Sequence, residues 1–205
     1  MPTRMTALRF GSGGVALVSP VPIDDAMAAK IATLGEVWYL VAPNLLHHLY
    51  LAAAAARYPS ARVLAPKGLV QKRPDLRIDA FLEAGLPSDL SDDVCAVRVE
   101  GAPDVDEVAL FHAPSRTLVV TDLVFNVTRP RGLVAHIVLF LVGCHANLAQ
   151  SRAWRFFVKD RAAAAASIRT LLALPFETLV VAHGEVVHER AKEALGRALR
   201  WIETG

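Results

Sequence analysis

Cysteine is scarce in this sequence. Cys95 and Cys144 are the only two among 205 residues, and neither belongs to a C-x-x-C pair. Two thiols in a chain of this size are more typical of a reducing compartment than of a disulfide framework. A charge of one sign is also missing, because 22 basic and 20 acidic residues leave a net charge of only +2. With no run of Lys or Arg, this balance gives no indication of nucleic-acid binding.

A long apolar segment is missing as well. The most apolar stretch, Leu133 to Val142, is ten residues long and contains His136, whereas a membrane-spanning helix needs roughly twenty apolar residues. Residues 1–10 have no cationic start followed by an apolar run, so they do not have the pattern of a signal peptide. We therefore expect a cytoplasmic protein that does not bind membranes.

Hydrophobic residues, in contrast, are abundant. They make up 54% of the chain, which is enough for one well-packed domain over residues 1–205. Apolar or alternating runs predict strands at Ala16 to Val18, Glu36 to Val41, Arg62 to Ala65, Val94 to Val99, Glu107 to Phe111, Thr117 to Thr121 and Thr178 to Val181. The last two strands before residue 122 are expected to form a hairpin.

Alanine runs and capping residues predict the helices. They are expected from Asp24 to Lys30, Leu46 to Tyr58, Leu133 to Leu148, Arg161 to Leu174 and about Glu189 to Ile202, with caps at Asp24 and Asp160. The polar segment from Gln71 to Asp93 is expected to cover the edge of a sheet. Two blocks of strands, each followed by helices, predict an α/β protein with sheets packed together and helices outside.

Four segments place metal-binding residue types directly after or at the end of apolar strands. They carry His47 and His48, His112, Asp122 and His183. Loops at strand ends are a common place for a functional site, and imidazole with carboxylate suits zinc, iron or manganese. Each residue also has a purely structural interpretation. The histidine pair and His112 are equally compatible with facing solvent, Asp122 with closing an Asx turn, and His183 with a hydrogen-bonded turn.

The order of these segments resembles the metallo-β-lactamase superfamily over nearly the whole chain. The strand Val37 to Val41 leads into Pro43 to His48 and a helix, as the superfamily's strand leads into H-x-H-x-D-H. A hairpin strand ends at Asp122, and a late strand ends in Ala182-His183-Gly184. The resemblance implies an α/β fold of the metallo-β-lactamase type, a four-layer αββα sandwich. More narrowly, Ala42 to Asn44, Phe111 to Leu118 and Lys159 to Arg161 are similar to the family called domain of unknown function 4336.

The resemblance also implies which metal position is kept. The superfamily's first metal is held by residues that correspond here to Pro43, Leu45 and a position near Ala102, none of which can bind a metal. Its second metal corresponds to His47, His48, Asp122 and His183. We therefore expect one zinc, iron or manganese ion at most, and no organic cofactor. The expected ligands are His48, Asp122 and His183, with His47 as a fourth ligand or general base and His112 as a weaker supporting candidate.

Two functions remain open at this point. The first is a mononuclear metal-dependent hydrolase in which His47 and Asp122 take part in catalysis on an unknown small-molecule substrate. The second is a non-catalytic binding or structural protein on a degenerate metallo-β-lactamase fold, because a fold does not carry function by itself. The surplus of apolar residues makes a homodimer plausible.

Overall fold

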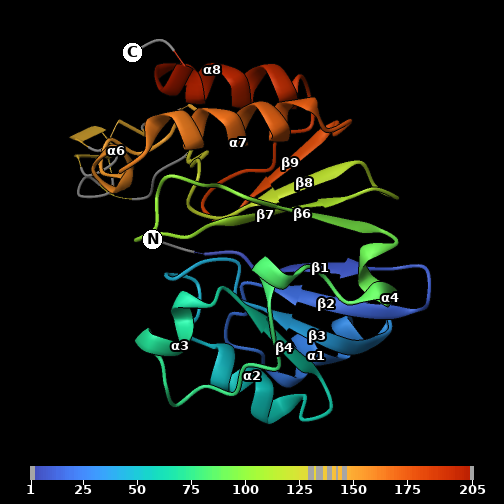
Figure 1. Cartoon of the computed structure of the whole chain (residues 1–205). Coiled ribbons are helices and arrows are strands. Elements are labelled where there is room, and N and C mark those ends of the chain that lie inside the picture. The colour runs from blue at the N-terminus through green and yellow to red at the C-terminus, as the bar shows by residue number, and fades with distance from the viewer. Residues whose placement is uncertain are drawn as a thin grey trace.

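Two β-sheets form the centre of the molecule in a computed structural model (Figure 1), which describes residues 3–128, 132, 136–137, 140–141, 143–144 and 147–203. The first sheet has the order β1-β2-β3-β4-β5, from strands Thr6–Arg9, Gly14–Val18, Glu36–Val41, Arg62–Ala65 and Ala80–Phe81. Only β1 is antiparallel to its neighbour there. The second sheet has the order β6-β7-β8-β9, from Val94–Arg98, Val108–His112, Thr117–Val120 and Thr178–Val181. In that sheet β8 and β9 are the parallel pair.

Helices cover the outer face of each sheet. Helices α1 (Asp25–Ala32), α2 (Leu51–Arg57) and α3 (Gly68–Lys72) lie on the first sheet, and α7 (Arg161–Ala173) and α8 (Ala191–Glu203) lie on the second (Figure 1). Short elements complete the description: η1 (Leu82–Ala84), α4 (Ser88–Ser91) and α6 (Trp154–Phe157). The arrangement is the four-layer αββα sandwich expected from the sequence. Each sheet is apolar on both faces, so one face packs against the other sheet and the opposite face packs against helices.

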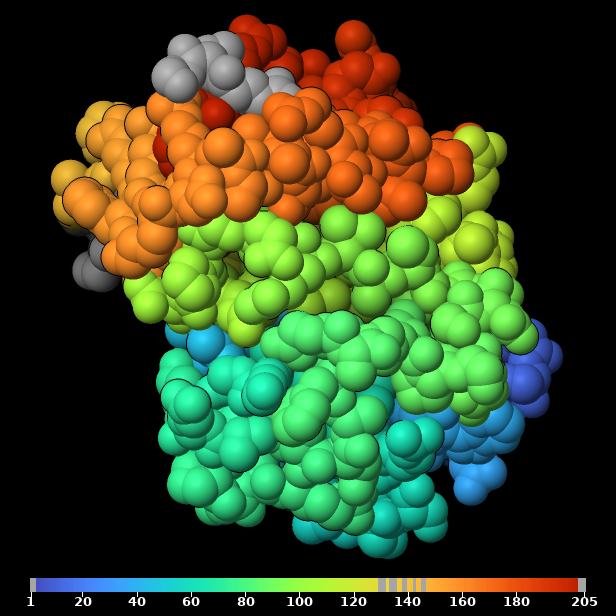
Figure 2. Space-filling view, in the orientation of Figure 1, coloured from blue at the N-terminus to red at the C-terminus, as the bar shows by residue number. Residues whose placement is uncertain are grey.

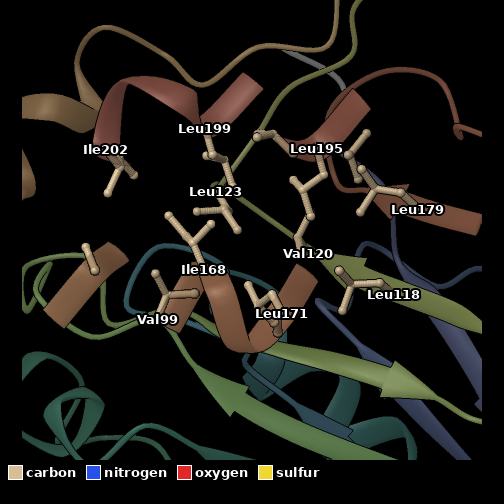
Figure 3. Close-up of a cluster of buried hydrophobic side chains, with 14 of the residues drawn as sticks. Val99, Leu118, Val120, Leu123, Ile168, Leu171, Leu179, Leu195, Leu199 and Ile202 are labelled. Carbon is tan, nitrogen blue, oxygen red and sulfur yellow. The ribbon is translucent and has the colours of Figure 1, made fainter. Parts of the chain in front are cut away.

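Three apolar clusters hold these layers together. One lies between the two sheets and includes Val18, Val41 and Leu110. A second joins the first sheet to its helices. The third joins the second sheet to α7 and α8, where Val120, Ile168 and Leu195 point toward one another (Figure 3). This third cluster fixes the end of β8, which carries one side of the candidate site.

Most of the predicted elements are confirmed, but one helix start was wrong and the short elements α3, β5, η1, α4 and α6 were not predicted. Strand β1 was not predicted from the sequence. The helix expected from Leu46 begins at Leu51 instead, because the side chain of Asn44 accepts hydrogen bonds from the backbone of Leu46 and His47 and holds this segment in turns. The predicted helix caps are present: Asp24 accepts from the backbone of Met27, and Asp160 from that of Ala163.

The segment from Gln71 to Asp93 does more than cover a sheet edge, because it supplies the edge strand β5, which pairs with β4. In the space-filling view, the green residues of this part of the chain form much of the near face below the orange residues of α7 (Figure 2). The helix predicted from Leu133 to Leu148 falls largely outside the described residues. No disulfide joins Cys95, which is exposed, to Cys144, which is buried. Among the described residues, no helix has the length and apolar character needed to span a membrane.

Candidate metal centre

The candidate site lies where three loops meet at the carboxyl ends of strands. Val120 and Val181 are paired at the ends of the parallel strands β8 and β9. Asp122 and His183 each follow two residues later, so the register of the sheet sets them side by side. His47 comes from the loop after β3, in the other sheet. The site therefore joins the two halves of the sandwich.

The side chains of His47, Asp122 and His183 converge. The Nε2 atom of His47 lies 3.2 Å from Oδ2 of Asp122 and 3.2 Å from Nε2 of His183. The Nε2 atom of His183 lies 3.5 Å from Oδ1 of Asp122. Two metal ligands at bond lengths of about 2.1 Å in a tetrahedral site lie roughly 3.4 Å apart. The three side chains therefore offer suitable atoms, all within 4.8 Å of one another, for a metal ion.

Two neighbours fix the orientation of the histidines. The Nδ1 atom of His47 lies 2.6 Å from the hydroxyl oxygen of Ser19, which directs Nε2 toward Asp122. The ring of His183 stacks on Phe125, with centroids 5.1 Å apart and planes inclined by 11°. Ser19 is buried and has a positive φ of 56°, and its backbone N–H donates to Val41. A hydrogen bond to the second ring nitrogen is the usual way of fixing the tautomer of a metal-binding histidine.

A Ser19→Ala variant is expected to weaken zinc binding roughly 10- to 100-fold, because His47 loses the partner that fixes its ring. Zinc affinity would be measured by competition with a chromophoric chelator. Ser12→Ala is the matched control, since Ser12 lies in the exposed turn between β1 and β2. Equal zinc affinity in the Ser19 variant and the parent would show that this hydroxyl does not position His47.

Asn44 holds the loop of His47 against the loop of Asp122. Its side-chain amide nitrogen donates to Oδ2 of Asp122 at 2.8 Å and to the hydroxyl of Thr121 at 3.0 Å. Its amide oxygen accepts from the backbone of Leu46 and His47. Asn44 is fully buried, and every one of these bonds fixes a residue of the site or its neighbour. This role of Asn44 was not predicted from the sequence.

Glu107 supports the loop of Asp122 by binding its backbone. Its two carboxylate oxygens accept hydrogen bonds from the backbone N–H groups of Thr121 and Asp122, at 2.7 and 2.8 Å. The side chain is completely buried. Burial, together with the negative charge of Asp122, raises the pKa of Glu107 to about 7. This residue was also missed, because an acidic residue at the start of a hairpin strand is usually exposed.

Asp122 and His47 shift each other's pKa in opposite directions. Burial acts to raise the pKa of Asp122, but hydrogen bonds from His183, His47 and Asn44 hold it well below its usual range. Burial acts to lower the pKa of His47, but its hydrogen bond to Asp122 and the charges of Asp122 and Glu107 raise it. Both shifts favour an ionised Asp122 beside a protonated His47.

Solved structures identify the architecture around this site. A metallo-β-lactamase from Pontibacter korlensis is 12% identical, with a TM-score of 0.63 over 99% of this chain and 88% of that protein. The chain has the metallo-β-lactamase fold. The mono-zinc form of the metallo-β-lactamase FIM-1 from Pseudomonas aeruginosa is 13% identical, with a TM-score of 0.59 over 99% of this chain and 85% of that one.

Another neighbour with the metallo-β-lactamase fold is a sensor protein. The structure of a peroxy diiron species of the chemotaxis sensor ODP is 12% identical, with a TM-score of 0.60 over 94% of this chain and 82% of that one. No protein-family model matches the sequence, and no curated protein matches it either. At these identities the likeness concerns the fold alone.

The other two predicted histidines lie apart from the cluster. The Nδ1 atom of His48 is 3.1 Å from a guanidinium nitrogen of Arg73, and burial with the charges of Lys72 and Arg73 lowers its pKa. His48 and His47 are adjacent in the sequence, but their rings contact different residues. His112 is paired with Thr117, at the far end of β8 from Asp122, and its ring contacts Ser115 and the carbonyl of Arg9. The structure therefore brings together three of the five predicted residues: His47, Asp122 and His183.

Proposed function

We propose that the protein is a metal-dependent hydrolase with one metal ion, held by His47, Asp122 and His183. The observation that carries the proposal is the convergence of two imidazole Nε2 atoms and one carboxylate at 3.2 to 3.5 Å. Two histidines and one carboxylate form the protein ligand set of several catalytic zinc and non-haem iron sites. Such a set leaves at least one coordination position for water or substrate.

The charge of the site supports a divalent cation. Asp122 and Glu107 are both buried, and the second lies directly behind the first through the backbone of residues 121 and 122. Among the described residues, neither carboxylate has an arginine or lysine partner. The ionised carboxylate of Asp122 is costly to bury unless a cation compensates it. A divalent ion would supply that charge, and it would also favour the ionised form of Glu107 behind Asp122.

The number of metal ions follows from the superfamily's ligand positions. The residues that correspond to the first metal are Pro43, Leu45 and a position near Ala102, and the resemblance places no metal-binding side chain at any of the three. FIM-1 has been solved in a form with a single zinc ion, so one-metal occupancy is compatible with this fold. Zinc, iron and manganese all suit the donor set, and we propose no organic cofactor.

When bound, the ion would supply Lewis acidity, which makes water more acidic and polarises the carbonyl or phosphoryl oxygen of a substrate. The protein's own groups do the positioning. Ser19 and Asn44 orient His47 and Asp122, and Glu107 fixes the backbone on which Asp122 sits. His47 is proposed as a ligand rather than a general base, because Nδ1 contacts Ser19 and Nε2 faces the cluster. A small-molecule ester, thioester or phosphodiester is the substrate class proposed.

One observation favours a second candidate, a non-catalytic protein. The three side chains are at hydrogen-bonding distances, so a single proton on His47 would also hold the cluster together without a metal. The resemblance to domain of unknown function 4336 does not decide between the two, since no activity is established for that family as a whole. The cluster would then take part in binding a small molecule or contribute only to the stability of the fold.

Metal analysis distinguishes the two candidates. We expect the purified protein, after incubation with zinc and dialysis, to retain about one equivalent, as a single three-ligand site predicts. Hydrolysis of an ester, a thioester and a phosphodiester would be measured with the zinc-loaded protein and with a His183→Ala variant. A parent protein that retains no zinc, iron or manganese would contradict the hydrolase proposal and favour the non-catalytic one.

A further inference from the structure

A concave site lies between residues 143, 147–150, 152 and 155 on one side and residues 194, 197 and 198 of α8 on the other. It is a cavity of about 460 Å³ whose lining includes Asn147, Gln150, Arg152, Arg155, Ala194 and Arg197. We call it the arginine cavity. Its volume is within the range of about 300–1,000 Å³ that is typical of small-molecule sites.

The charge of the arginine cavity is entirely positive. Three arginines line it, and none of the described lining residues is acidic. No arginine of the three forms a salt bridge within the described part of the chain. Arg155 lies over the ring of Trp201 at 4.7 Å, and Arg152 reaches only the carbonyl of Leu141, at 3.5 Å. All three arginines are exposed, so solvent screens their mutual repulsion, and an anion between them would reduce it further.

A buried amide without a hydrogen-bond partner for its nitrogen lies beside this cavity. Gln150 is 6% exposed, and its Oε1 accepts a hydrogen bond from the indole N–H of Trp201 at 2.7 Å. Since the indole can only donate, this bond identifies the other amide atom as Nε2. That nitrogen is buried and has no hydrogen-bond partner. An unsatisfied buried donor costs about 1–3 kcal/mol, so a rotation that brought this nitrogen to an acceptor in the cavity would be favourable.

We propose that the arginine cavity binds an oxyanion, namely a phosphate group. Guanidinium groups present several N–H donors in a planar fork that matches phosphate oxygens, and the unpaired amide nitrogen of Gln150 lies beside them. The site does not depend on the proposed metal. The two are connected structurally, because Ala149 beside Gln150 pairs with Phe125, whose ring stacks on His183.

The test uses inorganic phosphate and the whole protein at constant ionic strength, with chloride as the balancing anion. In ¹⁵N-resolved NMR spectra, we expect the indole signal of Trp201 and the side-chain amide signal of Gln150 to shift on titration. The indole signal of Trp38, which hydrogen-bonds Glu36 in the other sheet, is expected to stay in place. A His183→Ala variant should give the same shifts, which separates this site from phosphate bound at the proposed metal.

Two matched variants test the arginines. Arg197→Ala is expected to weaken phosphate binding about 10- to 100-fold, the loss typical of one charge-assisted hydrogen bond. Arg169→Ala removes the same charge from an exposed position on α7 that does not line the cavity, and should leave the affinity unchanged. Equal losses in the two variants, or no shift of the Trp201 and Gln150 signals at millimolar phosphate, would overturn the proposal.

A parallel titration asks which molecule carries the phosphate. A nucleoside monophosphate and glycerol 3-phosphate would be compared with inorganic phosphate in the same NMR experiment. Tighter binding of either organic phosphate identifies a phosphorylated small molecule as the ligand. Equal affinity for all three identifies the phosphate group alone as the determinant. Both results support an oxyanion site, and they differ only in which molecule supplies the phosphate group.

Discussion

A His47→Ala variant is expected to lose its bound zinc, whereas a His48→Ala variant is expected to keep it. The two histidines are adjacent, yet only the Nε2 atom of His47 faces Asp122 and His183, at 3.2 Å from each. Removing one of three protein ligands should weaken zinc binding by more than the roughly 10- to 100-fold typical of supporting residues. Zinc content after dialysis and zinc affinity by chelator competition would measure the difference.

The His48→Ala variant is a close control for this experiment. It removes the same kind of side chain from the neighbouring position, where the ring contacts Arg73 instead of the cluster. Circular dichroism would establish that both variants are folded. If His48→Ala lost the metal and His47→Ala kept it, the ligand set would be His48, Asp122 and His183, as the sequence alone suggested.

A Glu107→Ala variant is expected to reduce the free energy of unfolding by roughly 3–5 kcal/mol, near the upper end for single substitutions. The carboxylate is the acceptor for two buried backbone N–H groups, those of Thr121 and Asp122, and each unsatisfied donor costs about 1–3 kcal/mol. Zinc affinity should fall as well, because the backbone that carries Asp122 would lose its support. Urea denaturation and zinc titration would measure the two effects.

Glu107→Gln separates the hydrogen bonds from the charge. The amide keeps one oxygen acceptor, so we expect a loss of stability between those of the parent and of Glu107→Ala. It also removes a buried group whose pKa is raised to about 7, which favours the variant at neutral pH. If Glu107→Gln were as unstable as Glu107→Ala, the two hydrogen bonds would not explain the effect.

The fold was largely predictable because burial leaves a strong pattern in the sequence. Strands β3 and β4 are nearly continuous apolar runs, as expected of strands covered on both faces, and the alanine-rich α7 begins at a capping aspartate. Strand β1 was missed because it is short and lies at the edge of its sheet. The start of α2 was placed too early because the hydrogen bonds of Asn44 hold residues 44–50 in turns.

The site was predictable only in part, because residue spacing does not determine side-chain direction in a turn. The sequence placed metal-binding residue types in the right loops but left the choice between His47 and His48 to a family pattern. In the structure, Ser19 determines the direction of the His47 ring, and Ser19 lies 28 residues earlier in the chain. Asn44 contacts Asp122 from 78 residues away and Glu107 contacts the backbone of Thr121 from 14 residues away, so no local signal could have revealed these contacts.

The sequence distance between the converging side chains affects how the protein would fold. His47 and His183 are 136 residues apart, and they meet only after both sheets have formed and packed. An unfolded chain presents these groups separately, so a metal ion would bind the native state almost exclusively and stabilise it by mass action. Contacts this distant in sequence form late, so the ion is expected to slow unfolding more than it speeds folding. The bound metal would therefore lengthen the lifetime of the folded protein.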